Sequence, residues 1–142
     1  MVENAVLVDS SIWIEGIDPK CPREIKSILG TLLEAKQVMI TDIIRLEVIG
    51  GARSVTEFER YREEFQEIYC LEITSREWRM AEDYSFLLGR KGQRIPAADI
   101  LIVAVAVSHG IPLWHVDSDF ERVRSVVSNF KTYWYPKSNP SL

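Results

Sequence analysis

Short apolar stretches alternate with segments of helical spacing along nearly the whole chain. Five stretches rich in apolar or β-branched residues are expected to be strands, at 5–8, 38–41, 68–73, 113–116 and 131–134. The spacing of apolar residues between them predicts helices over 22–35, 41–53, 55–67, 77–88 and 96–110. Such alternation requires crossover connections, and it therefore predicts an α/β fold with a parallel sheet covered on both faces.

The composition is that of one globular domain. Of the 142 residues, 46% are hydrophobic and 27% charged, and we find no repeat or linker that would divide them. We therefore expect a single domain over residues 1–135 and a loose tail over 136–142. The longest apolar run, Ile100 to Val107, has eight residues, whereas a membrane helix needs about 20. With no signal-peptide pattern before Asp9, and with Cys21 and Cys70 far apart, we expect a cytoplasmic protein with reduced thiols.

Five acidic residues stand where an apolar element ends or where an apolar helix face is interrupted. Asp9 and Asp117 directly follow expected strands, and ligands of open parallel sheets bind beyond such carboxyl ends. Asp99 interrupts the most apolar helix, Glu47 lies on an apolar helix face, and Asp119 follows Asp117 by two positions. A buried carboxylate is costly unless it is paired, hydrogen-bonded or bound to a metal. The set therefore suggests an acidic pocket that holds a cation.

Each acid also has a structural explanation when it is taken alone. Asp9 and Asp119 could cap helices, and Asp99 could interact favourably with a helix dipole. The stem of Glu47 could simply cover apolar surface. Several carboxylates that converge, however, raise one another's pKa values unless a cation offsets their charge. Oxygen ligands favour Mg²⁺ or Mn²⁺ over zinc, and such sites activate water to hydrolyse phosphodiesters.

The net charge leaves a nucleic-acid substrate open. A formal charge of −4 argues against a broad basic surface for nucleic acid. Without the five candidate carboxylates the charge would be +1, so part of the acidity belongs to the site itself. A bound divalent cation would offset it.

Four runs resemble, in order and spacing, the four motifs of PIN domains: Val8–Ile14, Glu47–Gly50, Ala98–Ala104 and Asp117–Phe120. Length and motif order are most similar to the VapC-type toxins of toxin–antitoxin operons. The resemblance implies a three-layer α/β/α sandwich with a central parallel five-stranded sheet. It also implies Mg²⁺- or Mn²⁺-dependent endoribonuclease activity on RNA, a homodimer, and inhibition by a small antitoxin protein.

The resemblance also assigns roles to the acids. Asp9, Glu47, Asp99 and Asp117 match the family's catalytic, metal-binding acids, and Asp119 matches a further position that is often acidic. These five are the expected metal ligands.

Five residues are candidates for contact with the substrate: Ser10, Arg90, Lys91, Arg94 and His115. The basic loop before the Asp99 helix could hold RNA phosphates, or it could simply be solvated. Ser10 has the alternative of capping a helix. The family usually has Thr or Ser where this chain has His115, which could act as a donor to water or substrate or could merely fill the site.

Other functions are less compatible with the residue pattern. Phosphoryl transfer through an aspartyl phosphate requires a Lys after a late strand or an Asp-x-Asp pair at the first strand. The chain offers only Lys137 near its end, and Asp9-Ser10-Ser11 at the first strand. A solitary PIN-like RNA-processing nuclease and a non-catalytic PIN-like binding module remain as alternatives to a toxin.

Overall fold

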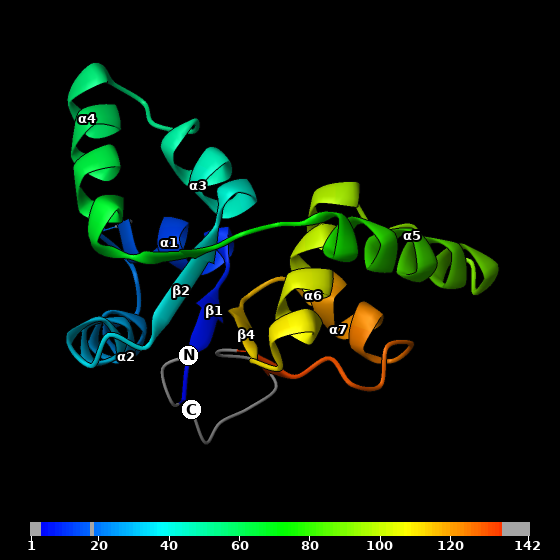
Figure 1. The fold of residues 1–142 in the computed structure, drawn as a ribbon. Helices are drawn as coiled ribbons and strands as arrows, with labels where there is room; N and C mark the ends of the chain where they lie inside the picture. Colours follow the sequence, from blue (N-terminus) through cyan, green and yellow to red (C-terminus); the bar gives the residue numbers. More distant parts are fainter. Residues whose placement is uncertain (1–3, 18, 135–142) are drawn as a thin grey trace.

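Five parallel strands form one sheet in the order β3-β2-β1-β4-β5 (Figure 1). The structure, a computed structural model, describes residues 4–17 and 19–134. The strands are β1 (Val6–Val8), β2 (Val38–Thr41), β3 (Tyr69–Leu71), β4 (Leu113–His115) and β5 (Thr132–Trp134). All five lie within the stretches expected from the sequence.

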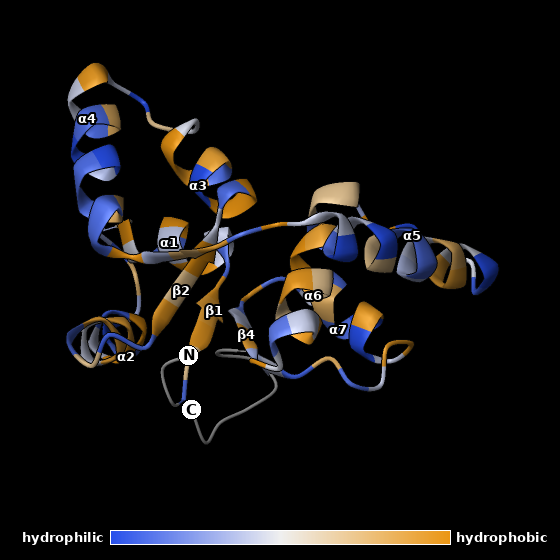
Figure 2. Cartoon of the chain, in the orientation of Figure 1, coloured by the Kyte–Doolittle hydropathy of each residue, from blue (hydrophilic) through white to orange (hydrophobic). Residues whose placement is uncertain are grey.

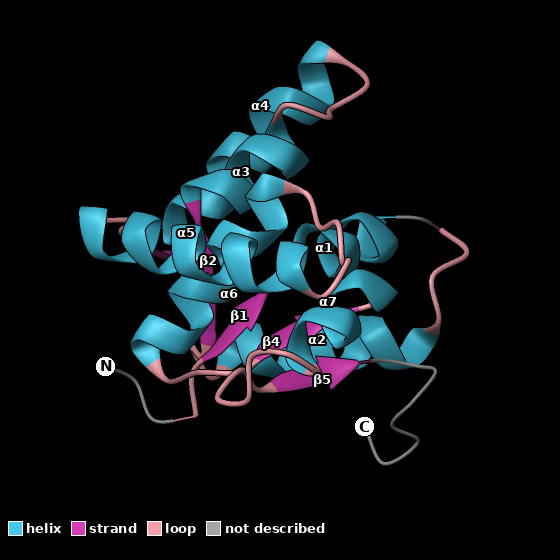
Figure 3. Cartoon of the chain, turned by 90° about the vertical axis from the view of Figure 1, so that its right-hand side faces the viewer, coloured by secondary structure: helices cyan, strands magenta, loops and turns pink. Residues whose placement is uncertain are grey.

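Helices cover both faces of this sheet. They are α1 (Ser10–Ile17), α2 (Arg23–Glu34), α3 (Asp42–Ile49), α4 (Val55–Glu64), the 3-10 turn η1 (Phe65–Glu67), α5 (Ser75–Arg90), α6 (Ala97–His109) and α7 (Ser118–Arg124). In Figure 1, α1 to α4 lie to the left of the strands or above them, and α5 to α7 lie to the right. In the view turned by 90°, helices partly cover the strands (Figure 3). The expected α/β/α sandwich is therefore confirmed.

The order of the strands reverses direction at β1. The chain passes outward from β1 to β2 and β3, then returns to the other side of β1 to form β4 and β5. Strands β1 and β4 are hydrogen-bonded neighbours in which Val8 is opposite Trp114. The Asp9 N–H also donates to the Trp114 carbonyl at 3.0 Å. The two strand ends that carry Asp9 and Asp117 are thereby adjacent, at the switch point where α/β sheets bind ligands.

The core lies on both faces of the sheet, and helix α6 is its most buried helix. Every residue of α6 from Ile100 to Ala106 is buried, as expected for a helix that is apolar nearly all round. β1 and β2 are also apolar along their length, whereas much of α4 is hydrophilic (Figure 2). α6 is thus a rigid support for a polar residue in its first turn.

Several boundaries differ from those expected. The short helix α1 was not predicted, because only the possible caps at Ser10 and Ser11 were visible in the sequence. The helix predicted over 77–88 begins at Ser75, after a capping box at Thr74, and continues through Gly89 to Arg90. The segment 55–67 divides into α4 and η1, and the helix predicted over 41–53 ends at Ile49. The tail predicted over 136–142 lies outside the described residues.

The carboxylate of Glu77 joins α5 to α6. It accepts hydrogen bonds from the Thr74 N–H at 2.8 Å, the Thr74 hydroxyl at 2.7 Å and the Ser108 hydroxyl at 2.6 Å. Although burial raises the pKa of Glu77, these hydrogen bonds outweigh it and lower the pKa to about 2.

Two further expectations concern thiols and membranes. Among the described residues, neither Cys21 nor Cys70 is in a disulfide bond. Among the residues described, no helix combines the length and apolar character needed to cross a membrane.

Candidate metal centre

Asp9 directly follows β1, and only one of its two carboxylate oxygens accepts hydrogen bonds within the described residues. Its side chain is 3% exposed. Oδ2 accepts from the Ser11 N–H at 3.0 Å and from the Ser11 hydroxyl at 2.6 Å. Oδ1 is buried and has no hydrogen-bond partner within residues 4–17 and 19–134. Burial raises the pKa of Asp9 in spite of the Ser11 hydrogen bonds, and the charge of Glu47 adds to the rise.

Glu47 reaches the same edge of the sheet from helix α3. The sequence placed it on the apolar face of Ile43 and Ile44, but its side chain is exposed while Ile44 is buried. The Ser10 hydroxyl donates to Glu47 Oε1 at 3.0 Å. Ser10, a candidate for substrate contact, is therefore engaged in holding Glu47.

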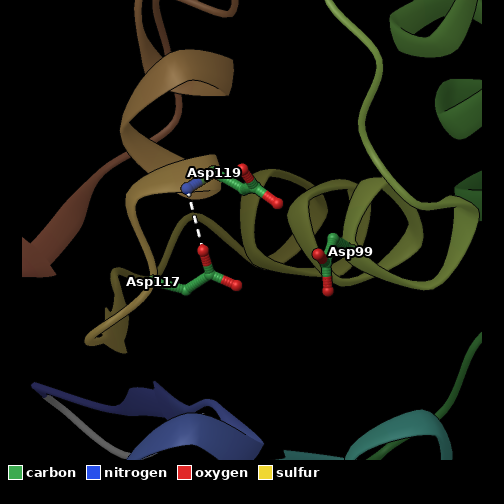
Figure 4. Close-up of side chains that lie close together, drawn as sticks. All are labelled: Asp99, Asp117 and Asp119. Carbon is green, nitrogen blue, oxygen red and sulfur yellow. Dashed lines mark hydrogen bonds between the residues drawn. The ribbon is translucent and has the colours of Figure 1, made fainter.

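Asp117 and Asp119 are presented by the turn between β4 and α7. Asp117 is the N-cap of α7, and its Oδ1 accepts from the Asp119 N–H at 2.9 Å (Figure 4). The Asp119 carboxylate is paired with the guanidinium of Arg122 one turn later on α7. Arg122 was not singled out from the sequence, where it resembles any exposed helix arginine.

Asp99 completes the cluster from the first turn of α6. One carboxylate oxygen from each of Asp99, Asp117 and Asp119 lies within 4.8 Å of the others, and the three side chains approach one another from two helix ends (Figure 4). The pKa of Asp99 is raised to about 7, first by burial and then by the negative charges of Asp9, Asp117, Glu47 and Asp119. The charges of the other four candidate acids therefore all act on Asp99, although only three of the five acids form the tight group.

These residues fit a hard divalent cation. The donors are carboxylate oxygens, which suit Mg²⁺ or Mn²⁺. The buried Asp9 Oδ1 that lacks a partner, and the raised pKa of Asp99, are both features that a bound cation would relieve. The role of the five acids as ligands stays a prediction.

His115 is the last residue of β4 and has no exposed surface. The Asp117 N–H donates to its Nδ1 at 3.0 Å, and its Nε2 is 2.8 Å from Glu121 Oε2. Burial lowers the pKa of His115, so the imidazole is neutral near pH 7. A direct contact between His115 and substrate, which was one of its expected roles, is incompatible with this burial. Glu121 was missed, because a Glu six positions from a His carries no signal in a sequence.

The basic loop lies beside the acidic group. Arg90, Lys91 and Arg94 are exposed, and Gly92 adopts a positive φ of 72° that favours glycine. Arg122, the partner of Asp119, also donates to Gln93 Oε1 at 3.3 Å. The loop borders a cavity of about 320 Å³. The loop is therefore linked to the acidic group through Arg122.

The model of the PIN domain family matches residues 6–126. The chain belongs to the PIN-domain family. Ribonuclease VapC18 of Mycobacterium tuberculosis is 26% identical over 131 residues, which are 89% of this chain and 92% of that protein. Ribonuclease VapC51 of the same organism is 35% identical over 98 residues, which are 67% of this chain and 70% of that protein.

Solved structures share the fold of this PIN domain. VapBC2 from Rickettsia felis, bound to a promoter DNA fragment, has a TM-score of 0.76 at 15% identity and covers 93% of this chain and 99% of its own. DNA-bound VapBC from Salmonella typhimurium has a TM-score of 0.75 at 22% identity and covers 93% of this chain and 98% of its own. The family model and the two VapC relatives confirm the resemblance to PIN domains of the VapC type.

Proposed function

We propose that this PIN domain is an Mg²⁺- or Mn²⁺-dependent endoribonuclease. The observation that carries the proposal is the group formed by Asp99, Asp117 and Asp119, coupled electrostatically to Asp9 and Glu47 at the switch point of the sheet. Two relatives named as ribonucleases support RNA as the substrate.

The chain's own residues would hold the cation and orient the substrate. Asp9 would offer the buried oxygen Oδ1, and Asp117 the oxygen that the Asp119 N–H does not use. Ser11 and Ser10 hold the carboxylates of Asp9 and Glu47. When bound, the cation supplies Lewis acidity, which activates water and stabilises charge on the phosphodiester. No side chain needs to act as a covalent nucleophile.

Arg90, Lys91 and Arg94 would bind RNA phosphates on either side of the bond that is cleaved. Their exposure and the link from Gln93 through Arg122 to Asp119 support this arrangement. Contacts with phosphate supply most of the affinity that does not depend on sequence.

We also propose that the protein is the toxin of a toxin–antitoxin pair. The names of the VapC relatives and of the VapBC structures support an antitoxin partner, and the family resemblance supports a homodimer. The partner would inhibit by placing an Arg or Lys in the acidic pocket, because a guanidinium binds carboxylates in a bidentate manner.

The test is cleavage of single-stranded RNA by the purified protein with and without divalent cation. We expect cleavage with Mg²⁺ or Mn²⁺, and none in excess chelator or with Asp99→Asn. Undiminished cleavage in chelator would overturn the metal dependence. Binding of Mn²⁺ without cleavage of any RNA would favour a binding module, and the absence of a short antitoxin gene next to this one would favour a solitary RNA-processing nuclease.

A further inference from the structure

The turn that presents Asp117 has three of its backbone N–H groups bonded to side chains. The Val116 N–H donates to Ser11 Oγ at 3.2 Å, the Asp117 N–H to His115 Nδ1 at 3.0 Å, and the Asp119 N–H to Asp117 Oδ1 at 2.9 Å. The position of the Asp117 carboxylate is therefore set by these acceptors and not by the strand alone. The middle acceptor is the unusual one, because it is an aromatic nitrogen.

The protonation of His115 follows from its two partners. A backbone N–H can only donate, so Nδ1 must present its lone pair to Asp117. The proton of the neutral ring is then on Nε2, which donates to Glu121 Oε2 at 2.8 Å. The Glu121 carboxylate oxygen accepts this hydrogen bond. The contacts with Asp117 and Glu121 therefore both require the tautomer that is protonated at Nε2.

The surroundings also fix the plane of the ring. His115 is 0% exposed, and its ring centroid is 5.0 Å from that of Phe120. Glu121 Oε1 is held in turn by Arg124 at 3.1 Å. A buried ring held at both nitrogens and on one face has one orientation, so Nδ1 is an acceptor of fixed position.

We propose that Glu121 and His115 form a positioning pair for Asp117, in which the carboxylate fixes the imidazole and the imidazole fixes the backbone of the metal-binding acid. The inference rests on the proposed cation site. In metal sites a carboxylate commonly orients a histidine that is itself a ligand. Here the oriented histidine is not itself a ligand. It acts through the backbone N–H of Asp117, which is the proposed ligand. One carboxylate oxygen of Asp117 accepts a hydrogen bond from the Asp119 N–H. The direction of the other oxygen is then determined by the turn.

Two substitutions of His115 test the contributions of its two ring nitrogens separately. In His115→Asn the amide oxygen lies as many bonds from the backbone as Nδ1, so an acceptor for the Asp117 N–H is kept. In His115→Gln the amide lies as far out as Nε2, so the Glu121 contact is kept and the acceptor for Asp117 is lost. Glu121→Leu removes the carboxylate, and Glu63→Leu, at an exposed position of α4, is the matched control.

The experiment measures Mn²⁺ affinity by calorimetric titration, at a temperature where circular dichroism shows each variant folded. We expect Glu63→Leu to match wild type and His115→Asn to stay within about threefold of it. His115→Gln and Glu121→Leu should bind about tenfold or more weakly, the scale of outer partners in metal sites. Equal affinities of the Asn and Gln variants overturn the proposal. A wild-type protein that binds no Mn²⁺ overturns the cation site itself, and the positioning pair with it.

A second measurement does not depend on the metal. Long-range ¹H–¹⁵N spectra of the metal-free wild-type protein should show His115 with a protonated Nε2 and an unprotonated Nδ1. A protonated Nδ1 could not accept from Asp117 and would overturn the proposal even if the substitutions impaired folding.

Discussion

Ser11 and Val116, which are 105 positions apart in the chain, are joined by a hydrogen bond of 3.2 Å from the Val116 N–H to the Ser11 hydroxyl. The same hydroxyl donates to Asp9 Oδ2 at 2.6 Å. One side chain thus ties the end of β4 to the carboxylate at the end of β1. The separation between the first and last acidic motifs is controlled by a residue that is not itself acidic.

Substitution of Ser11 should therefore affect stability and cation binding together. In Ser11→Ala, the Val116 N–H loses its acceptor and Asp9 loses one donor. We expect the free energy of unfolding to fall by about 1–3 kcal/mol, the usual cost of leaving a buried polar group unpaired. Urea denaturation and Mn²⁺ titration measure the two effects. Ser27→Ala, at an exposed position of α2, is the control, and equal behaviour of the two variants would contradict this role.

Asp99 should make the metal-free protein less stable as the pH rises. Its folded-state pKa of about 7 lies above the ordinary 3.8, so the protonated form is favoured by folding. The contribution to stability is complete below pH 3.8 and is lost as the pH rises through 7. Asp99→Asn, which cannot ionise, should show a flatter dependence of the unfolding free energy on pH over this window and at pH 8 should be at least as stable as wild type.

Added Mn²⁺ should distinguish a ligand from a structural acid at this position. A cation that binds only the folded state raises the melting temperature of the wild-type protein. The increase should be much smaller for Asp99→Asn, and ribonuclease activity should fall by orders of magnitude. Thermal melts of both proteins with and without Mn²⁺ measure this. A destabilised variant that keeps the full Mn²⁺ effect would show that Asp99 is structural.

The sequence predicted the elements of the fold better than the details of the site. Strand positions and the burial of α6 follow from the apolar pattern, which is a local property of the chain. Helix α1 was missed because its eight residues include Gly16 and only the possible caps at Ser10 and Ser11 indicated a helix. The extension of α5 through Gly89 was missed because glycine is only a weak helix breaker when packing supports the helix.

The acids could be selected from the sequence because they interrupt apolar elements. Their supports could not be selected, since Ser11, Glu121 and Arg122 are ordinary polar residues until the fold brings them to Asp9, His115 and Asp119. The orientation of the His115 side chain could not be predicted either, because a histidine at the end of a strand can face the substrate or the core. In the fold, β4 lies between β1 and β5, and His115 is fully buried.

Glu77 provides the opposite pH dependence to Asp99. Its pKa is lowered to about 2 from the ordinary 4.5, so its contribution to stability is present above pH 4.5 and is lost as the pH falls toward 2. Glu77→Gln should lower the free energy of unfolding at pH 7 by about 1.5–3 kcal/mol, because three hydrogen bonds to a charged acceptor are weakened. Mn²⁺ affinity should be unchanged. Chemical denaturation measures the free energy of unfolding at pH 7 and at pH 3. A variant as stable as wild type at pH 7 would contradict the role of Glu77 in joining α5 to α6.

Arg94 should contribute to RNA affinity without contributing to cation binding. It is exposed and borders the cavity beside Gln93, whose amide is linked through Arg122 to Asp119. Arg94→Ala should weaken binding of single-stranded RNA about equally for different sequences. It should also lower the slope of log affinity against log salt concentration by about one, as expected when one phosphate contact is lost. Fluorescence anisotropy in chelator, which prevents the proposed cleavage, measures affinity at several salt concentrations. Arg23→Ala, on α2, should leave the slope unchanged. If both variants have the wild-type slope, the loop does not bind phosphate.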